Sequence, residues 1–169
     1  MNTTLALLLI TPLLSSSPAE PGSPSTHLSW APPTSFQHIV RLRPDMDRGY
    51  AYLLAQLIEK HAKQQRVSPR RLVAIAMQES GIRQINRIED GQPSDYGIFQ
   101  FHHNTAKALG LDTKRLQYDV EYQIASAASL LRSKINLCRR KGMNKPWACY
   151  HSATPALAER YIAAVERYE

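Results

Sequence analysis

Hydrophobic residues recur at intervals of three and four over most of the chain after residue 46, a spacing that is typical of amphipathic helices. The expected helices, each with a cap or start signal, cover residues 47–65, 68–80, 105–109, 119 to about 137, and 155 onward. Between residues 82 and 97 the period is lost, and turn-forming residues such as Glu89-Asp90-Gly91 favour short strands or a hairpin. The pattern therefore predicts a mainly α domain with one small irregular or β segment.

Glu79 lies on the apolar stripe of the helix expected over residues 68–80. Seven residues at roughly 100° each place it about 20° from Leu72 around the helix axis. Burial disfavours the ionised form and raises the pKa of a carboxyl group, which is one way to make a general acid. The alternative is a structural ion pair with Arg83, Arg70 or Arg71, and periodicity alone favours that alternative.

The N-terminal part of the chain has the composition of a targeting segment followed by a linker. An apolar run over residues 5–14 precedes small residues up to Ala19, which predicts a signal peptide over residues 1–19 and export to the periplasm. The run is too short to span a bilayer, and a disordered N-terminus is the alternative. Residues 20–44 are rich in proline and predict an unpacked linker, so that the domain covers residues 45–169.

The formal net charge is +7, and no charged residue precedes Glu20, so cleavage after residue 19 leaves this charge unchanged. A basic protein favours an anionic partner, namely nucleic acid, a membrane surface or an acidic polymer of the cell wall. The chain lacks zinc-finger spacing, an aromatic RNA-binding signature and a helix-turn-helix pattern, and an exported protein rarely meets nucleic acid. Nucleic acid is therefore not the expected partner.

Cys138 and Cys149 are the only two cysteines of the chain. An oxidising compartment would let them pair and close the basic loop between them, at a gain of about 3 kcal/mol on the chain-entropy model. Two separate buried thiols are the alternative. Export favours the disulfide.

Several motifs together resemble one enzyme family. Glu79-Ser80, Gly97-Ile98-Phe99-Gln100, Tyr150 and the tail that begins at Tyr161 occur in the order and spacing of lytic transglycosylases with a goose-type lysozyme-like (SLT) domain. The resemblance covers about residues 47–168 and is greatest to small exported members that accompany conjugation and secretion machines. It implies a lysozyme-like fold, peptidoglycan as substrate, a monomer, and a secretion or conjugation complex as a further partner.

The resemblance also implies roles for individual residues. Glu79 corresponds to the sole acid/base, which cleaves the bond between N-acetylmuramic acid (MurNAc) and N-acetylglucosamine (GlcNAc) and leaves a 1,6-anhydro sugar. Ser80 corresponds to a residue that supports the sugar and the glutamate, and Gln100 to one that lines the cleft. The hydroxyl of Tyr150 is expected to reach the catalytic carboxyl group, and Tyr161 to lie near the site.

Tyr96 and Gly97 complete the expected substrate-binding set. Gly97 lets the backbone approach the sugar or satisfies a turn with positive φ, and both interpretations stay open. Tyr96 stacks on a sugar or packs in the core. No metal or other cofactor is expected, and His102 and His103 are interpreted as surface residues.

Two other functions remain alternatives at this point. Most glycosidases use a pair of carboxylates, so Asp90 or Asp95 could activate water in a hydrolytic muramidase. A non-catalytic cell-wall-binding or assembly protein could keep the same fold. The chain also departs from the family pattern, because His151 stands after Tyr150 where the family usually has Asn. This departure bears on the outer subsites and not on the class of reaction.

Overall fold

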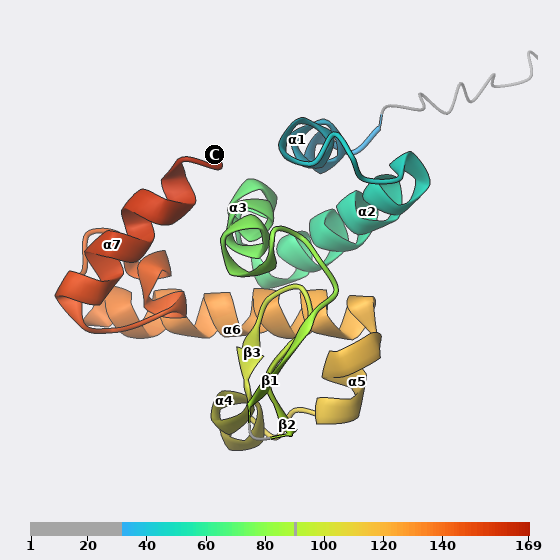
Figure 1. The fold of residues 1–169 in the computed structure, drawn as a ribbon. Coiled ribbons are helices and arrows are strands. Elements are labelled where there is room, and N and C mark those ends of the chain that lie inside the picture. The colour runs from blue at the N-terminus through green and yellow to red at the C-terminus, as the bar shows by residue number, and fades with distance from the viewer. Residues whose placement is uncertain (1–31, 90) are drawn as a thin grey trace, which may run out of the picture. The chain divides into compact units, whose positions relative to one another are not determined.

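The computed structural model describes residues 32–89 and 91–169. Helices are interrupted once, after α3, by a small sheet whose strands pair antiparallel in the order β1-β2-β3 (Figure 1). The elements are α1 (Thr34–Leu42), α2 (Arg48–Gln65), α3 (Pro69–Ser80), β1 (Asn86–Glu89), β2 (Gln92–Tyr96), β3 (Phe101–His102), α4 (His103–Ala108), α5 (Thr113–Tyr118), α6 (Val120–Arg140), the 3₁₀ helix η1 (Pro146–Tyr150) and α7 (Pro155–Glu166). Within these residues, no helix has the length and apolar character needed to cross a membrane.

The mainly α fold with a small β segment is confirmed, and so are several of the expected boundaries. The side chain of Asp47 accepts a hydrogen bond from the Tyr50 amide and caps α2. Ser68 caps α3 in the same way, and Gly81 ends that helix in the left-handed conformation. Local capping chemistry therefore sets the length of α3, the helix whose last turn carries Glu79.

Helix α1 corrects the expectation of an unpacked linker. It lies inside the proline-rich segment, and its Ile39 is fully buried against the core. The prolines of this segment flank the helix at positions 33 and 44 and do not interrupt it, so Phe36, Ile39 and Val40 can form an apolar stripe. Residues 1–31, which include the expected signal peptide and the first part of the linker, lie outside the described residues.

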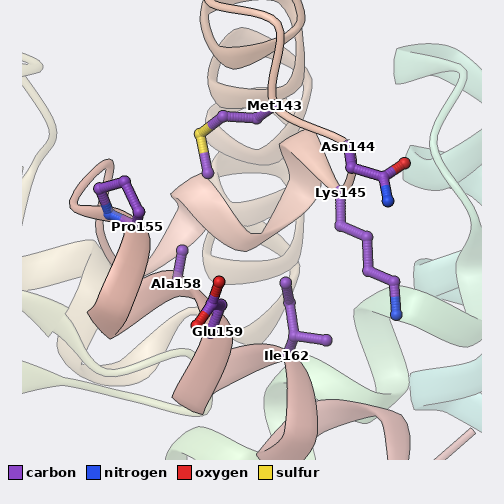
Figure 2. A pocket seen from close by; sticks show the side chains of 7 residues that line it. All are labelled: Met143, Asn144, Lys145, Pro155, Ala158, Glu159 and Ile162. Carbon is purple, nitrogen blue, oxygen red and sulfur yellow. The ribbon is translucent and has the colours of Figure 1, made fainter.

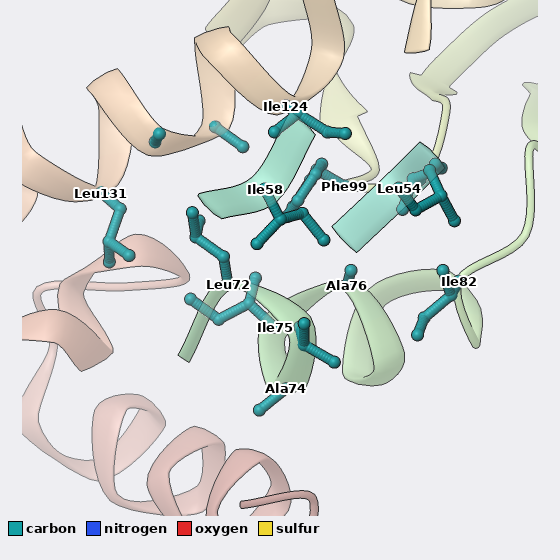
Figure 3. Close-up of a cluster of buried hydrophobic side chains, with 14 of the residues drawn as sticks. Leu54, Ile58, Leu72, Ala74, Ile75, Ala76, Ile82, Phe99, Ile124 and Leu131 are labelled. Carbon is teal, nitrogen blue, oxygen red and sulfur yellow. The ribbon is translucent and has the colours of Figure 1, made fainter. Parts of the chain in front are cut away.

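The core surrounds α3. Its residues 72–76 are all fully buried, because α1, α2 and α7 pack on it (Figure 1). Figure 3 shows side chains of α3 meeting Leu54 and Ile58 of α2, Phe99 of the turn after β2, and Ile124 and Leu131 of α6. A helix enclosed on several sides has little freedom to rotate or slide. The last turn of α3 is therefore held in a fixed position.

A disulfide joins Cys138 in the last turns of α6 to Cys149 in η1, as expected. Both residues are buried. The segment that the sequence predicts as a plain loop is a short 3₁₀ helix, and the bond fixes it against α6. Tyr150 follows the second cysteine directly, so the disulfide also positions this tyrosine.

Candidate active site

Glu79 lies in a cavity of about 330 Å³ between the end of α3, the β hairpin and η1. Its lining combines charged and aromatic side chains from segments that are far apart in the sequence. These residues are Glu79, Arg87, Asp95, Phe99, Gln100, Phe101, His102, Thr105, Leu130, Tyr150 and His151. A concave site with a few convergent polar groups is the usual form of a ligand-binding or catalytic site.

The Glu79 carboxylate accepts a hydrogen bond of 2.6 Å from the hydroxyl of Tyr161 on α7. Burial raises the pKa of Glu79, and the hydrogen bond and the charge of Arg87 oppose this effect. Within residues 32–89 and 91–169, Glu79 forms no ion pair with an arginine, and Arg71 pairs with Glu169 instead. The structural ion pair is therefore the wrong interpretation, and Glu79 has the surroundings of a proton donor.

The resemblance implied that the hydroxyl of Tyr150 contacts Glu79 and that Tyr161 only lies nearby, and the structure has the opposite arrangement. Tyr161 donates to Glu79, whereas the hydroxyl of Tyr150 is buried and has no hydrogen-bond partner among the described residues. Burial and the charge of Glu79 raise the pKa of both hydroxyls, so both keep their protons at neutral pH. Tyr150 lines the cavity together with Glu79, but its hydroxyl has no exposed surface there. Sequence order could not decide which tyrosine points at Glu79, because this depends on the rotation of α7 and η1.

Ser80 ties the end of α3 to the turn after β2. Its hydroxyl donates to the backbone oxygen of Ile98 at 2.7 Å and accepts from the amide of Arg83 at 3.1 Å. Gln100 braces the same turn, since its Nε2 donates to the carbonyls of Ile85 and Gly97. Gln100 also lines the cavity, as expected.

Gly97 has a φ of +67°, and a Cβ at this position would overlap the side chain of Gln123. The two interpretations are not exclusive, and the turn with positive φ is confirmed, with the side chain of Gln123 packed closely against the glycine. Gln123 is fully buried, accepts from the Ile98 amide at 2.9 Å and donates to the Leu116 carbonyl at 2.8 Å. Gln123-Ile124 falls where the family usually has Asn-Ile, but nothing in the sequence predicted that the Gln123 side chain contacts Gly97.

Other expected residues divide into those at the cavity and those away from it. Tyr96 is buried, hydrogen-bonds through its hydroxyl to Nδ1 of His103 at 2.8 Å, and does not line the cavity. His102, expected at the surface, is exposed and lines the rim. Asp95 lines the cavity, and Asp90 lies outside the described residues.

A second cavity, of about 300 Å³, lies on the other side of Glu79 between α3 and α7. It shares Glu79 and His151 with the first cavity, and its other lining residues are Gln78, Leu157, Arg160, Tyr161 and Ala164. The ring of His151 stacks on that of Tyr161, with centroids 4.9 Å apart and planes at 10°. Because the two cavities meet at Glu79 and His151, we refer to them together as the cleft.

A third cavity, of about 420 Å³, lies away from this cleft, between the segment after α6 and the outer face of α7 (Figure 2). Its walls are mostly apolar, with Lys145 and Glu159 at the sides. It contains neither Glu79 nor a tyrosine hydroxyl, and its larger volume does not make it the catalytic site. Among residues 32–89 and 91–169, no three His, Cys, Asp or Glu side chains gather as a metal site would require.

A partly buried glutamate at the end of a core helix, beside a small β hairpin and in a cleft, defines a lysozyme-like glycan-cleaving domain. The family model of the transglycosylase SLT domain matches residues 56–163, and the chain belongs to this family. Its members cleave peptidoglycan by lytic transglycosylation. The match leaves out α1, which the structure nevertheless packs into the domain. Comparisons with curated proteins and with solved structures gave no match.

Proposed function

We propose that this chain cleaves the β-1,4 bond between MurNAc and GlcNAc of peptidoglycan without water and leaves a 1,6-anhydroMurNAc end. The observation that carries the proposal is Glu79, which is partly buried, unpaired with any described cation, and hydrogen-bonded to Tyr161. Its raised pKa favours a protonated carboxyl group, which the first step requires. The family match supports the substrate and the general reaction.

Glu79 performs both proton transfers. Its carboxyl group donates a proton to the glycosidic oxygen as the bond to C1 of MurNAc breaks, and GlcNAc leaves as the alcohol. The resulting carboxylate takes the proton of the C6 hydroxyl, whose oxygen then bonds to C1 and closes the anhydro ring. Tyr161 stabilises the carboxylate between these steps through its hydrogen bond. The N-acetyl group of the substrate can stabilise C1 in place of a second carboxylate.

Mass spectrometry of digested sacculi tests the reaction and the residue together. Wild-type protein should release muropeptides with anhydro ends, which are lighter by one water than hydrolytic products. Glu79→Gln keeps the shape of the side chain and should release none, while circular dichroism shows an unchanged helical spectrum. Muropeptide release by the folded Glu79→Gln protein would refute the assignment.

A hydrolytic muramidase is the second candidate, because Asp95 lines the same cavity as Glu79. Asp95 lies opposite Arg87 in the register of β1 and β2. If Asp95 activated water, products would carry reducing ends and Asp95→Asn would abolish their release. A transglycosylase with one catalytic carboxylate retains turnover in this variant. Absence of any soluble product with wild type would favour the non-catalytic cell-wall-binding protein.

We further propose that a signal peptide over residues 1–19 sends the protein to the periplasm, where it acts as a monomer and opens the wall for an envelope-spanning secretion or conjugation machine. The apolar run and small residues before residue 20 support export, and the net charge of +7 suits an acidic wall polymer. N-terminal sequencing of protein from the periplasmic fraction should begin near Glu20. Protein that retains Met1 in the cytoplasm would refute export.

A further inference from the structure

We propose that the cavity between α3 and α7 binds a carboxylate carried by the muramic acid part of the glycan, and that Arg160 is the residue that recognises it. The inference rests on the proposed function, because it assigns one side of the cleft to a part of that substrate. The carboxylate has two sources, the lactyl group of MurNAc itself and the stem peptide attached to it.

The position of the cavity makes it a substrate subsite. Glu79 and His151 belong to both this cavity and the one beside the hairpin. A glycosidic bond placed at Glu79 has one sugar on each side, and the two cavities that share Glu79 are the spaces available to these sugars. The α3–α7 cavity is therefore adjacent to one of the two sugars that flank the cleaved bond.

The charges around the cavity favour an anion. Arg160 lines it, and within residues 32–89 and 91–169 the Arg160 guanidinium has neither an ion pair nor a hydrogen bond. The acids of α7 lie away from this cavity, since Glu166 pairs with Lys145 at 2.6 Å and Glu159 lines the third cavity (Figure 2). Glu79 is the only acidic residue in the lining, and its carboxylate already accepts a hydrogen bond from Tyr161.

A second guanidinium, which does not itself line the cavity, is bonded to a residue of the lining. Arg167 donates to the side-chain oxygen of Gln78 at 3.1 Å, and Gln78 lines the cavity. A planar guanidinium with parallel donors matches a carboxylate group in geometry as well as charge. The remaining wall is apolar, from Leu157 and Ala164, and suits the methyl group of a lactyl unit or of an alanine residue in a peptide.

Binding to the inactive Glu79→Gln protein tests the inference without turnover. Titration calorimetry would compare chito-oligosaccharide, which has no carboxylate, with peptide-free glycan fragments, which keep the lactyl carboxylate, and with peptide-bearing fragments. Arg160→Ala and Arg160→Glu are introduced in this background. Arg139→Ala, at an exposed position of α6 outside both cavities, removes the same charge and serves as the control.

Arg160→Ala should weaken binding of carboxylate-bearing fragments by about two- to fivefold, the range of a partly exposed ion pair, and charge reversal should weaken it by about tenfold. Binding of chito-oligosaccharide and of all ligands to the control should not change. The stem peptide is joined to the lactyl carboxyl group through an amide bond, so only peptide-free fragments carry a free lactyl carboxylate. A loss confined to peptide-free fragments therefore assigns the lactyl carboxylate, a loss confined to peptide-bearing fragments assigns the peptide, and a loss for both shows that Arg160 binds either carboxylate. Unchanged affinities, or an equal loss with chito-oligosaccharide, would overturn the inference. Because catalysis is absent in this background, failure here is separate from failure of the proposed reaction.

Discussion

Tyr161→Phe removes the one hydrogen bond that the Glu79 carboxylate receives within the described part of the chain. The ring and its contact with His151 remain, so the change is confined to the hydroxyl. Glu79 is neutral when it begins to donate its proton and carries negative charge as the bond breaks. The hydrogen bond therefore strengthens toward the transition state, and its loss should lower kcat.

A hydrogen bond to a charged group contributes about 1.5–3 kcal/mol, and about 1.4 kcal/mol corresponds to a factor of ten in rate. We therefore expect kcat to fall by about ten- to a hundredfold. The pH dependence should change as well. The hydrogen bond lowers the pKa of Glu79, so its removal raises this pKa further and keeps Glu79 protonated to higher pH. The alkaline limb of kcat/KM should therefore move upward.

The assay is the initial rate of anhydromuropeptide release from sacculi, followed between about pH 4 and pH 8. Tyr122→Phe is a matched control, because its hydroxyl accepts a hydrogen bond from the Asp112 amide and Tyr122 lines neither cavity of the cleft. It should leave the pH profile unchanged. A Tyr161→Phe rate close to wild type, or an alkaline limb that stays in place or moves downward, would refute the argument.

Three further changes test the surroundings of the site. Gly97→Ala should lower the free energy of unfolding in urea by about 2–4 kcal/mol, because the residue has a positive φ and a methyl group would displace the buried Gln123 side chain. Gly142→Ala, which also has a positive φ but open space around it, should lower it by only about 1 kcal/mol. Equal losses would contradict the steric argument. Replacing Cys138 and Cys149 together by alanine should cost about 3 kcal/mol in thermal unfolding, and an unchanged Tm would show that the bond adds nothing. His151→Ala should admit water to Glu79, which lowers the pKa of its carboxyl group and moves the alkaline limb of activity downward. His151→Phe keeps a ring stacked on Tyr161 and should leave the limb unchanged. A limb that does not move in the alanine variant argues against this shielding.

Much of the helical fold follows from local signals. Asp47, Ser68 and Asp119 cap α2, α3 and α6 where the hydrophobic period begins, and Pro155 opens α7. Helix α1 has only nine residues, and the prolines around it obscure the apolar spacing that would predict it. Helix α5 has six residues, too few for a period to be recognised, although Asp112 provides its cap. Short elements depend on the tertiary contacts that stabilise them.

The sequence predicts which residues lie at the candidate site better than it predicts which of them contact one another. Glu79 and Gln100 are where the motif order implied, because both belong to segments whose shape is set locally. The partner of Glu79 is Tyr161, and the partner of Gly97 is Gln123. Each of these pairs joins segments whose relative rotation arises only when the core packs, so no local pattern could select them.

The disulfide gives the shape of the cleft a dependence on redox conditions. Cys149 directly precedes Tyr150, so its bond to Cys138 on α6 fixes the backbone one residue before the cleft wall. Such bonds form in oxidising compartments and are rare in a reducing cytosol. Before oxidation, Tyr150 and His151 are held by noncovalent contacts alone, and afterwards they are tethered to the long helix. Oxidation of two sulfur atoms is in this way a step in assembling a glycan-cleaving site, and the compartment in which the chain folds determines whether that step is taken.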